Sequence, residues 1–125
     1  MDLNELSGVV VNIAFELHSK FGPGLSEKVY EKLFCHELFK RKINYRDQVP
    51  IDLEHNGIRY KNAFKADLII EERLMLELKS CRPNKDLHFR QLHTYLKVSG
   101  LKLGLVINFD FPRIKDGIIR VANGI

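Results

Sequence analysis

Three charged residues stand inside two runs of apolar residues, in the stretch FKADLIIEERLMLELKS from Phe64 to Ser80. They are Asp67, Glu77 and Lys79, and charged side chains are almost never fully buried unless they are paired or bound to something. Two neighbouring carboxylates repel each other, and a hard divalent cation with oxygen ligands compensates for that repulsion. Such an ion polarises a phosphoryl oxygen and lowers the pKa of water, and a nearby lysine stabilises charge that develops on phosphate. The alternative is a solvated ion pair between Lys79 and one of the acids.

Strand geometry decides whether these three side chains can meet. Side chains alternate between the two faces of a strand, so Glu77 and Lys79 share one face, and Leu74, Leu76 and Leu78 point to the other, into the core. Directly opposed residues on antiparallel strands share a face. A three-residue turn from Glu71 to Arg73 places Asp67 opposite Glu77, whereas a two-residue turn places it on the wrong face. The pattern therefore allows an Asp-Glu-Lys cluster in one register only.

The rest of the chain must supply the elements that hold this cluster. Asp2 followed by Glu5 has the pattern of a capping box that opens a helix. Two glycines and a proline at 21–24 end that helix. The apolar spacing of the next helix predicts a buried stripe made of Leu25, Val29, Leu33, Phe34 and Leu38.

Alternating residues then indicate strands, and Asn56-Gly57 is a strong hairpin signal. A later helix should end at Gly100, with Phe89, Leu92 and Leu96 packed on the sheet. We expect helices over about residues 2–21, 25–41 and 86–98, strands over 45–53, 74–79 and 101–108, a strand ending at 66–70, and a short edge segment at 118–121. The order α-α-β-β-β-α-β predicts an α/β sandwich, with a mixed central sheet flanked by helices.

Length and composition limit the functional classes. The 125 residues suit one domain spanning 1–125, and 45% apolar with 29% charged residues is typical of a globular protein. The net charge of +4 and the pI near 9.1 permit binding to a polyanion without requiring it.

The cysteines and the first ten residues predict a cytoplasmic location. Cys35 and Cys81 form neither a CxxC motif nor a zinc-site spacing, which favours two reduced thiols. The segment MDLNELSGVV lacks the positive n-region of a signal peptide. No apolar run is long enough to span a bilayer, so no membrane partner is expected.

Asp67 followed by Glu77-Leu78-Lys79 resembles the PD-(D/E)XK nuclease signature, with Ala66 in place of the usual proline. Two further stretches strengthen the likeness: Gly24 to Tyr30 reads as GxxExxY, and Gln91 to Tyr95 reads as QxxxY. Together with residues 101–109 and 112–117, they closely resemble the small GxxExxY proteins, a family grouped with the PD-(D/E)XK superfamily. The likeness covers about residues 10–120 and implies a restriction-endonuclease-like fold.

The resemblance implies roles for individual residues. Asp67, Glu77 and the backbone carbonyl of Leu78 would bind Mg²⁺ or Mn²⁺, and Lys79 would be the catalytic lysine. Glu27 matches an acid that completes or supports the metal site in the superfamily. Its alternative is an acid favoured by the dipole at a helix N-terminus.

Further candidates surround this centre. Gln91 and Tyr95 share a helix face, joined by His88, and these three would hydrogen-bond a phosphate or orient the lysine. The alternative is the polar boundary of an amphipathic helix, which is favoured for His88. Tyr30 would contact substrate beside Glu27, or serve only as a core aromatic. Glu16 and His18 are held as substitutes for Glu27. Basic candidates for substrate binding, with solvated surface charge as their alternative, are Lys65, Arg82, Lys85 and Arg90.

The sequence thus leaves two functions open. One is a metal-dependent nuclease that hydrolyses phosphodiester bonds in DNA or RNA. The other is a non-catalytic module for nucleic-acid or protein binding that keeps the nuclease fold. A nuclease this small is expected to work as a homodimer or with a partner.

Overall fold

The computed structural model describes all 125 residues. The chain forms α1 (Leu3–Phe21), α2 (Glu27–Lys40), β1 (Tyr45–His55), β2 (Ile58–Ile70), β3 (Leu74–Lys79), α3 (Lys85–Ser99), β4 (Leu103–Asn108), a short 3₁₀ turn η1 (Ile114–Gly117) and β5 (Ile118–Ala122). This order confirms the predicted fold class, and the expected edge segment is the fifth strand.

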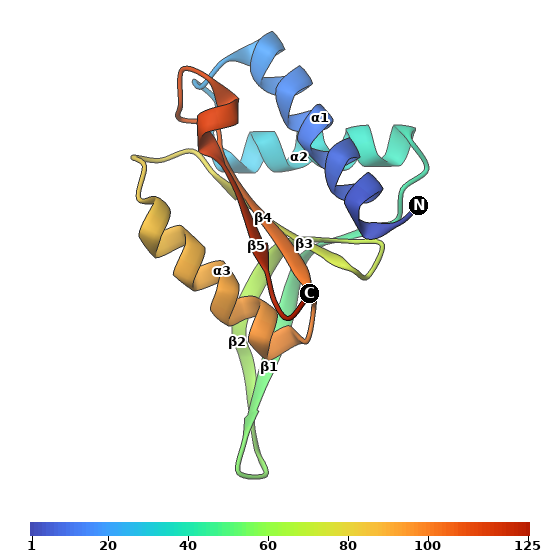
Figure 1. Ribbon diagram of the computed structural model, residues 1–125, viewed down its shortest axis with the longest axis vertical. Coiled ribbons are helices and arrows are strands. Elements are labelled where there is room, and N and C mark those ends of the chain that lie inside the picture. Colours follow the sequence, from blue (N-terminus) through green and yellow to red (C-terminus); the bar gives the residue numbers. More distant parts are fainter.

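The five strands form one mixed sheet in the order β1-β2-β3-β4-β5. Only β3 and β4 are parallel, and α3 provides the crossover that a parallel pair requires. Helices α1 and α2 cover one face of the sheet and α3 lies against the other, as Figure 1 shows. No helix has the length and apolar character needed to cross a membrane.

Local signals set the helix ends. Asp2 and Glu5 form the predicted capping box of α1. The hydroxyl of Ser26 accepts the N–H of Val29 and caps α2. Gly100 ends α3 in the left-handed conformation at φ 79°. The helices therefore begin and end within two residues of the expected positions.

The predicted stripe of α2 needs a correction. The fully buried residues of this helix are Tyr30, Phe34 and Leu38, spaced four apart along one face. Val29 is 41% exposed and Leu33 is only partly buried. The helix is rotated because the aromatic ring of Tyr30 takes the core position.

Two apolar clusters flank the sheet. The larger, of 19 buried residues, joins α1 and α2 to Leu74, Leu76 and Leu78 of β3. The smaller, of eight, lies beneath α3 and includes Leu92 and Leu96 as expected. Phe89 was expected there too, but it is 41% exposed. The central strand β3 is covered on both faces, so a charge on it is buried.

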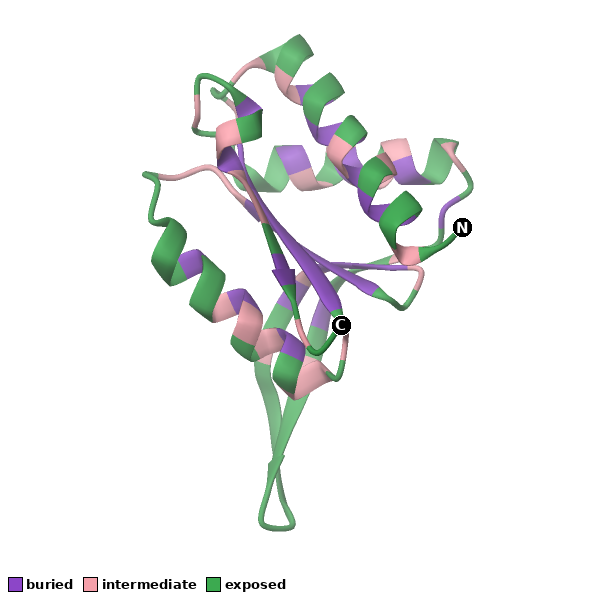
Figure 2. Cartoon of the chain, viewed as in Figure 1, coloured by how far each residue is buried: buried purple, intermediate pink, exposed green.

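The β1–β2 hairpin extends well beyond the helices. Asn56 and Gly57 make its turn with positive φ of 51° and 79°, as the Asn-Gly signal predicts. Residues 52–63 are all exposed, and Figure 2 shows the green hairpin projecting from the purple core. The hairpin therefore contributes to the core only through the parts of β1 and β2 outside residues 52–63.

A close backbone approach at Gly117 yields a stability prediction. A Cβ at this position would collide with the carbonyl oxygen of Asn108 and lie 2.8 Å from the Phe111 ring. We expect Gly117→Ala to lower the free energy of unfolding by about 1–3 kcal/mol, measured by urea denaturation. Gly8→Ala is the control, because no heavy atom lies within 4 Å of that Cβ. It should be neutral or stabilising by about 0.5–1 kcal/mol; equal losses in both variants would contradict the packing argument.

Candidate active site

The turn between β2 and β3 has the one register that brings the acids together. Ile70 pairs with Leu74 and Leu68 with Leu76, so residues 71–73 form the three-residue turn. Glu71 and Glu72 adopt positive φ of 53° and 55° to make it. Continued by one residue, this register sets Asp67 opposite Glu77, which confirms the predicted strand pairing.

Each of the two acids is bonded to the backbone of the other strand. The N–H of Asp67 donates to Oε2 of Glu77 at 2.8 Å, and the N–H of Leu78 donates to Oδ2 of Asp67 at 2.9 Å. The carboxylates thus replace backbone carbonyls as acceptors at this point of the sheet. One oxygen of each is fixed, and the other has no backbone donor.

The alternation of side chains along β2 is interrupted at Asp67. Ala66 packs in the cluster beneath α3, whereas Leu68 packs in the cluster beneath α1 and α2. Residues two apart in a regular strand share a face, so the alternation breaks between them. On β1, Gln48 lies between the partners of these two residues and has a positive φ of 49°. Such a conformation is costly for a residue other than glycine and concentrates at functional sites.

Burial is the largest cause that raises the pKa of both acids, and a neighbouring negative charge adds to it in each case. Glu77 is only 6% exposed, and burial together with the charge of Asp67 raises its pKa to about 8. Burial likewise raises the pKa of Asp67, while the N–H of Leu78 and the ammonium of Lys79 oppose that shift. A metal-free site therefore favours a proton on Glu77 at neutral pH.

Lys79 lies beside the acids and is held from α3. Its Nζ donates to Oε1 of Gln91 at 3.4 Å, and its charge lowers the pKa of both Asp67 and Glu77. Its carbonyl accepts the N–H of Phe109 at 2.9 Å, which extends the parallel pairing with β4. The lysine is thus fixed at the backbone and at the tip.

The other predicted residues of α3 differ in their placement. The ring of Tyr95 stacks on Phe64 at 3.8 Å between centroids. Burial and the negative charge of Glu77 raise the pKa of Tyr95. His88 is 8% exposed, and burial followed by the charge of Lys79 lowers its pKa. Tyr95 therefore lies near the acids, and His88 is a buried residue close enough to Lys79 for that charge to lower its pKa.

Glu27 stands at the edge of the site. It is exposed, and its Oε2 accepts the N–H of Ser80 at 3.4 Å. The hydroxyl of Ser80 donates to the carbonyl of Leu25 at 2.8 Å, which ties the end of β3 to the start of α2. The charge of Glu27 raises the pKa of Asp67. No three acidic, histidine or cysteine side chains converge as ready ligands of one ion, so Glu27 is near the pair but not joined to it.

Two residues beside Asp67 were not found from the sequence. The amide Nε2 of Gln48 donates to Oε1 of Glu31 at 2.7 Å and approaches Oδ1 of Asp67 at 3.5 Å. A hollow of about 320 Å³ is lined by Glu27, Lys28, Glu31, Gln48 and Asp67. Only polar residues line it, and no spacing motif links β1 to α2, so no sequence signal identified them.

The structure corrects the prediction for Tyr30. The side chain is fully buried and stacks on Phe109 with 3.8 Å between ring centroids. Its hydroxyl donates to the carbonyl of Gly22 and accepts the N–H of Leu25 at 3.3 Å. A ring enclosed in this way cannot touch a substrate, so its position in the motif serves the loop before α2.

The basic candidates and the substitute residues have other partners. Arg90 forms an ion pair with Asp86 one turn earlier, and Lys85 lies over the ring of Phe111 at 5.5 Å. Glu16 pairs with Arg41 at 3.0 Å, and Nε2 of His18 contacts the carbonyl of Phe111 at 2.8 Å. Glu16 and His18 therefore do not replace Glu27 at the acids, while Lys65 and Arg82 remain exposed.

The chemistry of the acidic pair fits a divalent cation. Asp67 and Glu77 offer hard oxygen ligands, and one oxygen of each lacks a backbone donor. Their raised pKa values show that two adjacent negative charges are unfavourable here without a counter-charge. A divalent cation would supply that charge, and the Leu78 carbonyl remains a predicted third ligand.

Comparisons with known proteins agree with this geometry. A family model described as the PD-(D/E)XK nuclease superfamily matches residues 4–121. The crystal structure of the protein SSO0001 is similar over 78% of this chain, with a TM-score of 0.58 and 22% sequence identity. This chain spans about half of that protein, covering 50% of it, and the likeness concerns the fold. A comparison with curated proteins finds no match.

The raised pKa of Glu77 predicts an unusual pH dependence. Between the ordinary value of 4.5 and about 8, the folded protein holds a proton that the unfolded chain releases. The free energy of unfolding in EDTA should therefore fall as pH rises through this window. Glu77→Gln should flatten the slope and raise the Tm above that of the wild type at pH 8.5. The exposed hairpin variant Glu54→Gln is the control, and a wild-type slope unchanged by Glu77→Gln would contradict the assignment.

The buried hydroxyl of Tyr30 predicts a loss of stability without a loss of site chemistry. Tyr30→Phe leaves the Gly22 carbonyl and the Leu25 N–H without their partner. We expect a cost of about 1–2 kcal/mol in urea denaturation, with the metal-induced change in Tm retained. Tyr60→Phe in the exposed hairpin should cost nothing. A lost metal response in folded Tyr30→Phe would return this residue to the site.

Proposed function

The chain belongs to the PD-(D/E)XK nuclease superfamily, and on that basis we propose that it is a metal-dependent nuclease acting on DNA or RNA. The observation that supports this most is the paired bonding of Asp67 and Glu77 across β2 and β3. A buried and a half-buried acid, both with raised pKa values, and a lysine beside them are arranged for charge chemistry rather than for stability.

Asp67, Glu77 and the Leu78 carbonyl would hold Mg²⁺ or Mn²⁺. The bound cation would supply Lewis-acid polarisation of the phosphate and a lower pKa of the attacking water. Glu77 must release its proton to bind the cation, so binding should strengthen as pH rises. Fixed backbone donors keep one oxygen of each acid in place throughout.

Lys79 is the residue of the chain best placed to stabilise developing negative charge. Gln91 accepts from its ammonium and thereby limits the positions that this flexible side chain adopts. Tyr95 lies on the same face of α3 as Gln91 and would in turn hold the Gln91 side chain in place. In this proposal Gln91 and Tyr95 position the lysine, and His88 closes the space behind it.

We further propose that residues 1–125 form one domain of the GxxExxY family. The motif residues have separate tasks in that case. Glu27 contributes negative charge at the edge of the site, and Tyr30 fixes the loop that places it. Nucleic acid is the proposed partner, and the expectation of a homodimer is tested by light scattering.

Metal binding tests the acidic pair directly. Mg²⁺ or Mn²⁺ should bind only the folded protein and raise its Tm by mass action. The rise should be larger at pH 8.5 than at pH 6, because protonated Glu77 competes with the cation. Asp67→Asn should abolish it, while the exposed control Asp52→Asn keeps it. Equal metal-induced shifts in wild type and Asp67→Asn would count against the site.

Activity tests the lysine separately. With Mg²⁺ or Mn²⁺ the purified protein should cut DNA or RNA from a panel of single strands, duplexes, flaps and junctions, and EDTA should stop it. Lys79→Ala should lower the cleavage rate at least about 100-fold while the metal-induced rise in Tm remains. Glu77→Ala should remove both, and Lys97→Ala on the far end of α3 should remove neither. An intact panel at micromolar protein with both metals would favour the non-catalytic module.

A further inference from the structure

The solvent face of α2 carries a row of four side chains spaced four residues apart: Lys28, Lys32, His36 and Lys40. We call this set the α2 outer row. All four are exposed, and the buried residues Tyr30, Phe34 and Leu38 lie on the opposite side of the helix. The three acids of the helix occupy other positions, and Glu37 pairs with Lys40 at 3.3 Å. Lys28 and Lys32 form no ion pair, so their positive charge is available to a ligand.

Each end of the α2 outer row opens on a hollow. Lys28 lines the hollow of about 320 Å³ that contains Asp67. His36 and Lys40 line a second pocket of about 580 Å³, which we call the end pocket. The row therefore connects the candidate active site with the end pocket. Twelve residues at 1.5 Å each separate these ends by about 18 Å.

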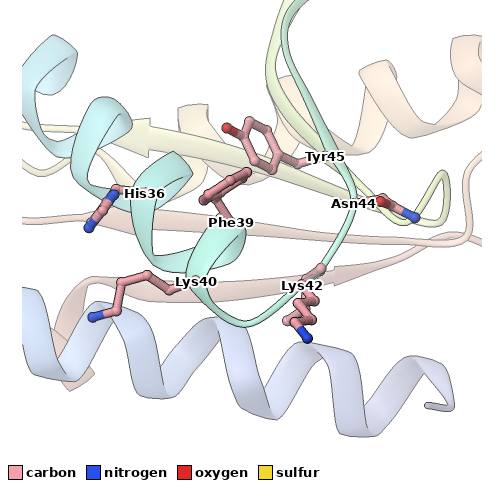
Figure 3. Close-up of a pocket in the computed structure, with 7 residues that line it drawn as sticks. His36, Phe39, Lys40, Lys42, Asn44 and Tyr45 are labelled. Carbon is pink, nitrogen blue, oxygen red and sulfur yellow. The ribbon is translucent and has the colours of Figure 1, made fainter.

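The end pocket combines aromatic rings with cations. Its lining contains Phe39, Tyr45, Lys40, Lys42 and His36, and no acidic residue. In Figure 3 the Phe39 and Tyr45 rings lie where α2 ends and β1 begins, and the two lysine side chains extend away from those rings. Phe39 is 72% exposed, so one face of its ring is open to a ligand.

Lys42 lies at the turn that ends α2. This residue closes α2 with a positive φ of 59°, and its N–H donates to the carbonyl of Phe39 at 3.0 Å. Glycine or asparagine usually takes this position, because a side chain there is strained. The lysine at this turn lines the end pocket and adds a positive charge there.

We propose that the α2 outer row and the end pocket bind a single strand of the nucleic-acid substrate, with a base stacked on Phe39. The inference rests on the proposed nuclease function and extends it to the path of the substrate. Lysines along one helix face fit a phosphate backbone, and exposed aromatic rings stack bases without regard to sequence. An acidic peptide would match the positive charge, but its acidic side chains would not stack on the exposed ring of Phe39.

Binding without cleavage is the first test. Fluorescence anisotropy in EDTA would follow labelled single-stranded DNA and RNA of about 12 nucleotides, with a duplex as a third arm. Phe39→Ala should weaken single-strand binding at least about fivefold. Lys42→Gly should also weaken it, although glycine suits that backbone, so unfolding cannot explain the loss. Lys32→Ala should reduce the salt slope of log K by about 0.7, the value for one contact with a single strand.

Matched controls come from the exposed hairpin. Tyr60→Ala and Lys61→Ala remove an exposed aromatic ring and a lysine that lie on another part of the molecule, and both should bind like the wild type. The inference is overturned if Phe39→Ala and Lys42→Gly also bind like the wild type, even if the protein cuts nucleic acid. It is likewise overturned if no arm binds, or if only the duplex does.

The same variants separate this inference from the proposed function. Cleavage that survives Asp67→Asn would disprove the assigned active site without touching the strand path. Binding that depends on Phe39, in a protein that cuts nothing, would support the path and reject the nuclease. Cleavage by a protein whose binding does not depend on Phe39 and Lys42 would support the nuclease and reject the strand path.

Discussion

The site depends on one exchange of hydrogen bonds between β2 and β3. Asp67 and Glu77 each accept a backbone N–H from the opposite strand, so both carboxylates are fixed inside a sheet that is covered on both faces. Charged hydrogen bonds of this kind are strong, but they do not cancel the cost of burying two like charges. The raised pKa values of both acids reflect the part of this burial cost that the hydrogen bonds do not offset.

The surrounding structure holds this unfavourable pair in place from three directions. On one side β3 pairs with β4 in parallel, and the Asn108 amide bonds the backbone of Cys81 at 3.0 and 3.4 Å, which fixes the chain after Lys79. Ser80 ties the same end of β3 to the loop before α2. Gln91 reaches Lys79 from α3. Each contact joins a different layer of the fold to the same few residues.

Local rules predicted much of this arrangement from the sequence, including the element order and the three-residue turn that opposes Asp67 to Glu77. They failed at Gln48 for a specific reason. The Asn56-Gly57 turn pairs His55 with Ile58, and that register continued unchanged would set Arg46 opposite Asp67. The register instead shifts between Ile51 and Leu53, which brings Gln48 there. A shift of this kind depends on tertiary packing and leaves no period in the sequence.

Helix α2 shows how one element serves the core, the site and the surface. Its aromatic residues pack inward, Glu27 and Glu31 face the end of β3 and Gln48 through hydrogen bonds, and its lysines point outward. Glu27 raises the pKa of Asp67 and Glu31 raises that of Glu77. Both therefore oppose ionisation of the site unless positive charge is near. At the surface, the lysines of the α2 outer row partly offset the negative potential of Glu27 and Glu31. Inside the hollow, those two acids are close enough to act on Asp67 and Glu77. The separation of charge around a single helix thus keeps negative potential at the carboxylates and leaves the approach to them open to a polyanion.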